Sequence, residues 1–187
     1  MGHYLFWTFS GIWLIIDFYI LVFYTRFSNK ENKERKSKYI MIILICLGVL
    51  LPTIIFKDFG ENFLRPFNFF RYFSLPFIFF GFSIRIYAVV SLGKFFSANV
   101  GVRKNQKLVK EGIYKYIRHP SYLGELMCFT GVAIAFFHPI ASFTTFIFPV
   151  IAFLIRIKIE EKILEKNLSY AYHEYKLKTK KLIPFIF

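Results

Sequence analysis

Five apolar runs, each close to the length that crosses a lipid bilayer, constrain this chain more than any other feature of its sequence. A helix needs about 20 apolar residues to span the hydrocarbon layer. The runs are residues 4–24, 39–56, 73–92, 122–137 and 140–157. The last two are separated only by His138 and Pro139, which predicts an antiparallel helical hairpin. The sequence therefore predicts an all-α, polytopic membrane protein with about five transmembrane helices.

The basic residues lie in alternate connections between these runs. Of the 25 Lys and Arg residues, six lie in 26–38, seven in 94–118 and eight in 156–187, whereas 57–71 holds three. Basic loops of membrane proteins stay in the cytoplasm, so we expect the N-terminus outside the cell and the C-terminus in the cytoplasm. We also expect the chain to contact membrane lipids, whose anionic headgroups attract the basic loops. The net charge of +14 is accompanied by no recognised nucleic-acid-binding motif, and we expect no nucleic-acid partner.

Two polar segments on the cytoplasmic side, residues 93–121 and 158–187, are too long to be turns. The second has the pattern of an amphipathic helix. Its apolar face is formed by Ile163, Leu164, Leu168, Tyr172 and Tyr175. We divide the chain into residues 1–92, with three spans, and residues 93–187, with both polar segments and the last two spans. The two cysteines lack spaced partners, so no metal site is expected.

The most informative stretch is residues 108–124, which leads into the fourth apolar run. Pro120 is suited to the first turn of a helix, whose free backbone N–H groups can bind an anion. The side chains expected around this helix start are Tyr114, His119, Ser121 and Tyr122. A purely structural interpretation remains open, in which these are interfacial aromatic and capping residues and Arg118 lies at the lipid headgroups.

Charged residues also occur within or at the ends of the apolar runs. Arg156 and Glu160 are four residues apart and share a helix face. They either take part in a reaction or form a structural ion pair at the membrane interface. Asp17 and Arg85 are expected to pair across helices, because an unpaired charge in a membrane is costly. Glu125 either lines a cavity or reaches the interface.

The sequence Arg-His-Pro-Ser-Tyr-Leu-Gly at 118–124 resembles the signature of the isoprenylcysteine carboxyl methyltransferase family and related phospholipid methyltransferases. So do Arg156 with Glu160 and Glu161, the run Tyr-His-Glu-Tyr-Lys at 172–176, and Pro184-Phe185. The resemblance covers roughly residues 92–187. The additional N-terminal spans of the eukaryotic enzymes are lacking, so the chain resembles the short prokaryotic form, which implies a prokaryotic cell membrane.

The family transfers a methyl group from S-adenosylmethionine to a lipid-borne acceptor, and the resemblance implies that residues 93–187 form the cofactor-binding and catalytic region. The positions that match its cofactor-binding residues are Asn99, Gln106, Lys107, Leu108, Val109, Tyr114, His119, Pro120, Ser121, Tyr122 and Glu160. Glu160 matches the acid beside the cofactor and Arg156 the residue facing the acceptor, which makes these two the catalytic candidates. Gln106 stands where the family usually has His.

The expected function is carboxyl O-methylation of a lipophilic acceptor of the isoprenylcysteine type at the cytoplasmic membrane face. A carboxylate is ionised near pH 7 and needs a cation rather than a base, which suits Arg156. The alternatives are methylation of a phospholipid amine or a small thiol. More distant alternatives are an NADPH-dependent membrane reductase of the sterol type and a non-enzymatic small membrane protein.

Overall fold

The computed structural model describes residues 2–25, 32–55, 68–93, 96, 108–136, 138–184 and 186–187, and the regular structure in these ranges is helical. The long helices are α1 (Gly2–Thr25), α2 (Asn32–Ile55), α4 (Asn68–Leu92), α5 (Pro120–Phe136) and α6 (Pro139–Lys178), with a short 3-10 helix η3 (Gly112–Lys115). Each predicted apolar run coincides with a separate long helix. The all-α part of the prediction is confirmed.

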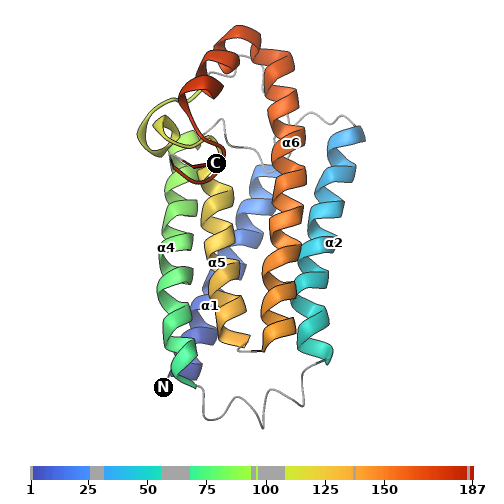
Figure 1. The fold of residues 1–187 in the computed structure, drawn as a ribbon, viewed down its shortest axis with the longest axis vertical. Helices are drawn as coiled ribbons and strands as arrows, with labels where there is room; N and C mark the ends of the chain where they lie inside the picture. The colour runs from blue at the N-terminus through green and yellow to red at the C-terminus, as the bar shows by residue number, and fades with distance from the viewer. Residues whose placement is uncertain are drawn as a thin grey trace.

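The helices lie side by side in an elongated bundle (Figure 1). α5 packs against α4 and α6, α1 packs against α4, and α2 packs against α6. α5 and α6 meet at the end of the bundle opposite the C-terminus, as Figure 1 shows, and they form the predicted helical hairpin. η3 and the end of α6 lie at the end of the bundle that carries the C-terminus, beside the start of α5.

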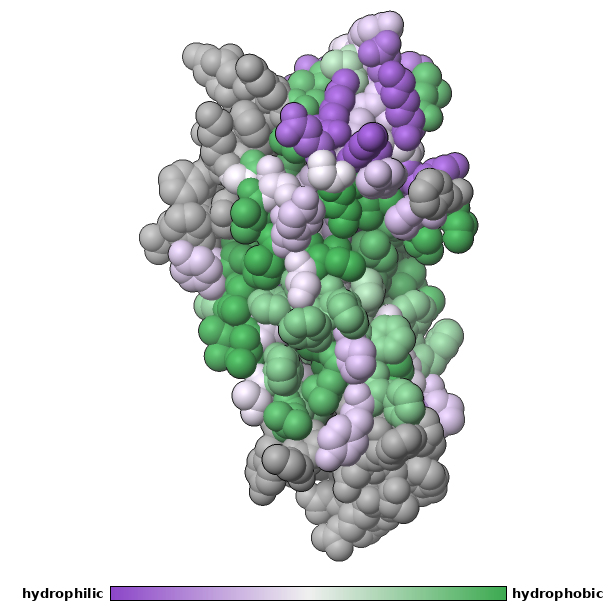
Figure 2. Space-filling view, turned by 90° about the vertical axis from the view of Figure 1, so that its left-hand side faces the viewer, coloured by the Kyte–Doolittle hydropathy of each residue, from purple (hydrophilic) through white to green (hydrophobic). Residues whose placement is uncertain are grey.

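The surface of the bundle is apolar along most of its length. Figure 2 shows a hydrophobic band below an end rich in hydrophilic residues. Large apolar side chains are widely exposed, among them Ile15 at 70%, Ile54 at 75% and Val90 at 70%. Within the described ranges, Tyr72–Leu92 and Pro139–Lys178 are long and apolar enough to cross a membrane, and Thr8–Ile20, Ser37–Pro52 and Pro120–Phe136 are shorter apolar helical stretches. Such a surface suits contact with lipid rather than water.

Glycines bring α4 and α5 into close contact. A Cβ atom added to Gly81 would lie 2.6 Å from the backbone oxygen of Gly124, and one added to Gly124 would lie 2.5 Å from that of Gly81. Small residues at a helix crossing let the two backbones approach, which is a common way of joining helices in membranes. The contact holds the first turns of α5 against the part of α4 that carries Arg85.

Substitution of Gly81 by alanine is therefore expected to lower the thermal unfolding midpoint in detergent, by the equivalent of about 1–3 kcal/mol, because the added methyl meets backbone that cannot yield. The matched control is Gly11→Ala, since a Cβ atom at Gly11 meets nothing within 4 Å. Alanine favours helix over glycine, so Gly11→Ala should leave the midpoint unchanged or raise it. Equal midpoints for the two variants would contradict the close α4–α5 contact.

The 40-residue helix α6 changes direction at Ser169, where a φ of 37° and a ψ of −112° depart from helical values. Beyond this bend the chain returns toward the start of α5 (Figure 1). We call residues 170–182 the C-terminal arm. Backbone hydrogen bonds join the arm to the segment before α5, from the N–H groups of Arg118 and His119 to the carbonyls of Lys180 (2.8 Å) and Lys181 (3.0 Å).

Glycine tolerates the backbone angles of Ser169 better than serine does, because its missing Cβ removes the steric penalty at positive φ. We expect Ser169→Gly to raise the thermal midpoint, by the equivalent of about 1 kcal/mol. Ser169→Ala is the control, since alanine loses the hydroxyl but keeps the Cβ, and it should bring no such gain. A midpoint that rises equally in both variants would show that the backbone angles are not the cause.

Candidate active site

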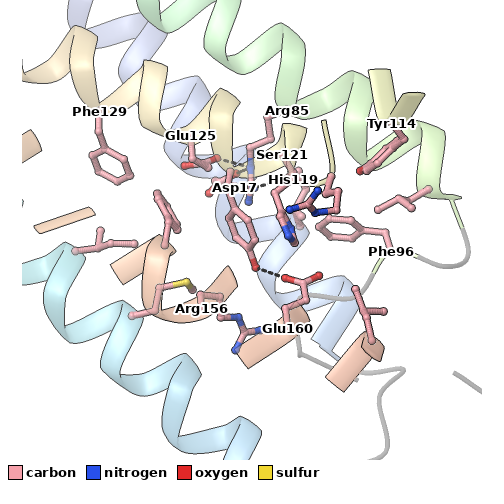
Figure 3. Close-up of a pocket in the computed structure, with 18 of the residues that line it drawn as sticks. Asp17, Arg85, Phe96, Tyr114, His119, Ser121, Glu125, Phe129, Arg156 and Glu160 are labelled. Atoms are coloured by element: carbon pink, nitrogen blue, oxygen red, sulfur yellow. Dashed lines mark hydrogen bonds and ion pairs between the residues drawn. The ribbon is translucent and has the colours of Figure 1, made fainter. Parts of the chain in front are cut away.

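A pocket of about 500 Å³ lies at the end of the bundle covered by the C-terminal arm. This volume is within the range of roughly 300–1,000 Å³ that is usual for small-molecule and cofactor sites. The pocket is lined from all five long helices and from residues 108–119, so its walls come from both residues 1–92 and residues 93–187. Figure 3 shows the side chains that surround it.

Most of the site residues predicted from the sequence line this pocket. They are Leu108, Val109, Tyr114, His119, Ser121, Tyr122, Arg156 and Glu160. Pro120 is buried and begins α5 but is not among the lining residues. Asn99, Gln106 and Lys107 lie outside the described residues.

Tyr122 connects the two motifs. Its hydroxyl donates a 2.9 Å hydrogen bond to a carboxylate oxygen of Glu160 and also lies against the guanidinium of Arg156. The ring of His119 is 5.8 Å from that of Tyr122, centroid to centroid. Figure 3 shows Arg156, Glu160 and His119 around one space. Two stretches that are distant in sequence, around residues 118–122 and 156–160, therefore meet in a single pocket, while their roles in chemistry remain predictions.

Arg118 occupies a different place from the one that the structural interpretation gave it. Its side chain is buried, its Nε donates to Glu161 Oε1 at 2.8 Å, and its Nη1 donates to the backbone oxygens of Lys176 (3.2 Å) and Thr179. Placement of Arg118 at the lipid headgroups is therefore wrong. The guanidinium has five N–H donors, and the carboxylate and carbonyl oxygens around it supply acceptors that a buried guanidinium needs.

Glu161 lies on the polar part of α6, beyond the apolar stretch that ends at Ile157. Burial alone raises the pKa of this carboxyl, but hydrogen bonds from His119 and Arg118 outweigh it and lower the pKa to about 2. His119 Nε2 is 3.3 Å from the same carboxylate oxygen that Arg118 contacts. Glu161 therefore stays ionised and fixes the orientation of the imidazole at the pocket wall.

Tyr114 links η3 to α4 and to the C-terminal arm. Its hydroxyl donates to the backbone oxygen of Ala88 at 3.2 Å, and its own backbone oxygen accepts a 2.7 Å hydrogen bond from the Tyr175 hydroxyl. Burial, together with the nearby Glu160 charge, raises the pKa of the Tyr114 phenol, so it remains a neutral donor. The segment that precedes α5 is thus fixed on two sides.

A group of charged residues, of which Arg85 and Glu125 are buried and Asp17 is partly buried, forms another part of the pocket wall. Arg85 pairs through Nε with both Asp17 and Glu125, and its Nη1 donates to Ser121 Oγ at 2.8 Å. The predicted pairing of Asp17 with Arg85 is confirmed, and Glu125 lines the pocket rather than reaching the interface. Sequence reasoning did not assign these three residues to the site, although charges within an apolar run were a usable signal.

The apolar wall of the pocket was not foreseen either. It comes largely from α1 and α2, through Trp13, Leu14, Phe18, Ile20, Met41, Ile42, Ile45 and Cys46. Tyr172 and Tyr175 of the C-terminal arm complete the lining at the polar end. In the sequence the α1 and α2 side chains look like any others on apolar helices, so no local pattern distinguishes them.

The fold and the pocket define a class of protein: a helical membrane protein with a deep pocket that joins a polar, charged end to an apolar wall. Comparison with protein families matches residues 74–166 to the isoprenylcysteine carboxyl methyltransferase family. The matched half of the chain is similar to this family of integral membrane proteins, as its motifs suggested.

Curated relatives carry the same family name. Protein-S-isoprenylcysteine O-methyltransferase B of Arabidopsis thaliana is 31% identical over 61% of this chain and 59% of its own length. The Saccharomyces cerevisiae protein-S-isoprenylcysteine O-methyltransferase is 40% identical over 54% of this chain and 44% of its own length. The chain thus spans about half the length of these two relatives. A probable enzyme of Oryza sativa subsp. indica is 26% identical over 96% of both chains.

A solved structure supports the fold. The eukaryotic intramembrane Ras methyltransferase, an isoprenylcysteine carboxyl methyltransferase, matches 86% of this chain and 55% of its own, with a TM-score of 0.58 and 23% identity. The helical arrangement described above is therefore that of a known membrane-protein fold.

Proposed function

We propose that this protein is an S-adenosylmethionine-dependent methyltransferase that esterifies the carboxylate of a lipophilic acceptor of the isoprenylcysteine type. The observation that carries the proposal is the meeting of Arg156 and Glu160 with His119 and Tyr122 in a pocket that also has an apolar wall. The polar end suits a nucleotide-like cofactor, and the apolar wall suits a lipid chain.

The donor set fits S-adenosylmethionine, which supplies a methyl group on a positively charged sulfur. Glu160 offers a carboxylate to this cation, and the aromatic faces of Tyr114 and Tyr122 attract it through cation–π interactions. His119, anchored by Glu161, provides a further polar contact. By family resemblance Asn99, Gln106 and Lys107 would contribute to the same binding site.

Arg156 is suited to the acceptor. Its side chain is almost fully buried, at 2% exposure, and lines the pocket near the α2 residues of the apolar wall. A guanidinium forms two parallel hydrogen bonds with a carboxylate and so draws it out of water and orients it. In the reaction a carboxylate oxygen bonds to the methyl carbon while the carbon–sulfur bond breaks, and no proton is transferred. The protein's task is therefore alignment and exclusion of water.

The same proposal includes the membrane arrangement. Five spans with the N-terminus outside would place the pocket and the C-terminal arm at the cytoplasmic edge of the bilayer, consistent with the alternation of basic loops. The polar cofactor would enter from the cytoplasm, and the acceptor would arrive sideways from among the membrane lipids. A prokaryotic cell membrane, implied by resemblance to the short form, stays a prediction.

The decisive experiment measures transfer of labelled methyl from S-adenosylmethionine by the purified protein in lipid vesicles. We expect label in a prenylcysteine analogue, and none in phosphatidylethanolamine, because Arg156 disfavours an amine that must lose a proton. Titration with S-adenosylhomocysteine should show binding and titration with NADPH should not. Binding of NADPH without binding of S-adenosylhomocysteine would contradict the proposed function and favour a reductase. Label in phosphatidylethanolamine would contradict the carboxylate acceptor and favour a phospholipid amine.

A further inference from the structure

Tyr172 is a buried residue of the C-terminal arm that lines the pocket. Its side chain is 1% exposed, and within the described part of the chain its hydroxyl has no hydrogen-bond partner. The carboxylates of Glu161 and Glu160 and the guanidinium of Arg118 are close enough to act on it electrostatically. Tyr172 therefore belongs to the polar end of the pocket rather than to the apolar wall formed by α1 and α2.

An unpaired buried hydroxyl does not stabilise a fold. Moving a hydroxyl out of water without a replacement hydrogen bond costs free energy, and nearly all buried polar side-chain atoms have a partner. Phenylalanine would fill the same volume at position 172 without this cost. The ring explains the packing of Tyr172, which lies 6.1 Å from the ring of Tyr175, but nothing in that packing requires the oxygen.

The other tyrosines of the arm show what a structural hydroxyl looks like here. Tyr175 donates its hydroxyl to the backbone oxygen of Tyr114 at 2.7 Å and so holds the arm on the segment before α5. Tyr170 is 74% exposed and donates to Glu174 at 2.9 Å. Tyr172 alone among these three combines burial, a position in the pocket wall and an unsatisfied hydroxyl.

We propose that Tyr172 is a cofactor contact, whose hydroxyl donates a hydrogen bond to a polar group of bound S-adenosylmethionine. This role rests on the proposed function and adds a recognition residue to it. Beyond the bend at Ser169 the arm returns toward the start of α5 (Figure 1) and its Tyr172 lines the pocket, so the arm contributes to cofactor affinity as well as covering the site. Loss of one neutral hydrogen bond of this kind weakens binding by about five- to tenfold.

The test compares Tyr172→Phe, Tyr175→Phe and Tyr170→Phe in the full-length protein, by calorimetric titration with S-adenosylhomocysteine and by thermal unfolding without ligand. Tyr172→Phe should bind about five- to tenfold more weakly, yet unfold at an unchanged or higher temperature. Tyr175→Phe should unfold at a lower temperature, because it loses a hydrogen bond that the fold uses. Tyr170→Phe should match the wild type in both measurements. The KM for S-adenosylmethionine should rise in Tyr172→Phe, and that for the acceptor should not.

Two results overturn the inference. One is unchanged S-adenosylhomocysteine affinity in Tyr172→Phe while the wild type binds. The other is a lowered unfolding temperature like that of Tyr175→Phe, which would make Tyr172 a structural residue. Absence of binding in the wild type itself is a separate outcome, which overturns the proposed function and the role of Tyr172 with it.

Discussion

Replacement of Arg156 by alanine is expected to reduce methyl transfer to a prenylcysteine acceptor by at least about 100- to 1,000-fold, the usual loss when a preorganised charged contact is removed from a buried site. S-adenosylhomocysteine affinity should change by less than about threefold, because the proposed function assigns the guanidinium to the acceptor and Glu160 to the cofactor. Arg156→Lys should also be strongly impaired, since an ammonium cannot form two parallel hydrogen bonds with a carboxylate.

The control for Arg156 is a neighbour that supports it. The Ser37 hydroxyl accepts a long 3.4 Å hydrogen bond from Arg156 Nη1, so Ser37→Ala leaves the guanidinium in the pocket with one weak contact fewer. Its turnover should fall by no more than about tenfold. Full activity in Arg156→Ala would remove Arg156 from the reaction. Equal loss of activity and cofactor affinity would instead mean that the substitution disrupts the whole pocket.

The largest effect on stability is expected at Arg118. Arg118→Met leaves Glu161 buried without its closest cation and releases the arm carbonyls of Lys176 and Thr179. Removing one partner of a buried ion pair costs about 3–5 kcal/mol. The thermal midpoint in detergent should fall accordingly, and protease should cleave the C-terminal arm faster than in the wild type.

The chain contains a matched control for this loss. Lys176 and Glu165 form an ion pair of 2.6 Å whose side chains are 39% and 46% exposed. Exposed pairs contribute about 0–1 kcal/mol, so Lys176→Met should barely move the midpoint. Arg118→Met combined with Glu161→Gln should recover part of the stability, because the uncompensated charge is gone. If Arg118→Met had the same thermal midpoint as Lys176→Met, the arm would be held by contacts other than those of Arg118.

Much of this fold follows from local patterns in the sequence. The lengths of the apolar runs predict the long helices, and the short connection at His138-Pro139 predicts the hairpin of α5 and α6. The positions of the Arg118–Gly124 and Arg156–Glu161 motifs predict the part of the pocket that α5 and α6 line. Both motifs lie where an apolar run begins or ends. The resemblance to a known family adds roles that spacing alone does not supply.

The rest depends on contacts between distant segments. Ser169 carries the bend of α6, and a serine gives no warning of positive φ, whereas glycine would have marked a turn. Arg118 looked interfacial because its partners, Glu161 and the carbonyls of the arm, are more than 40 residues away along the chain. The contribution of α1 and α2 to the pocket depends on how the helices pack, which apolar periodicity does not specify.

The distribution of the pocket lining along the chain has a consequence for biosynthesis. Trp13 and Asp17 lie on α1, whereas Tyr172 and Tyr175 lie near the end of α6 and are synthesised after α1, α2, α4 and α5. Asp17 therefore precedes its ion-pair partner Arg85 along the chain, and the pair can form only once α4 has been made. A chain that stops before the arm would lack Tyr172 and Tyr175, and the pocket would be left open where these two side chains line it.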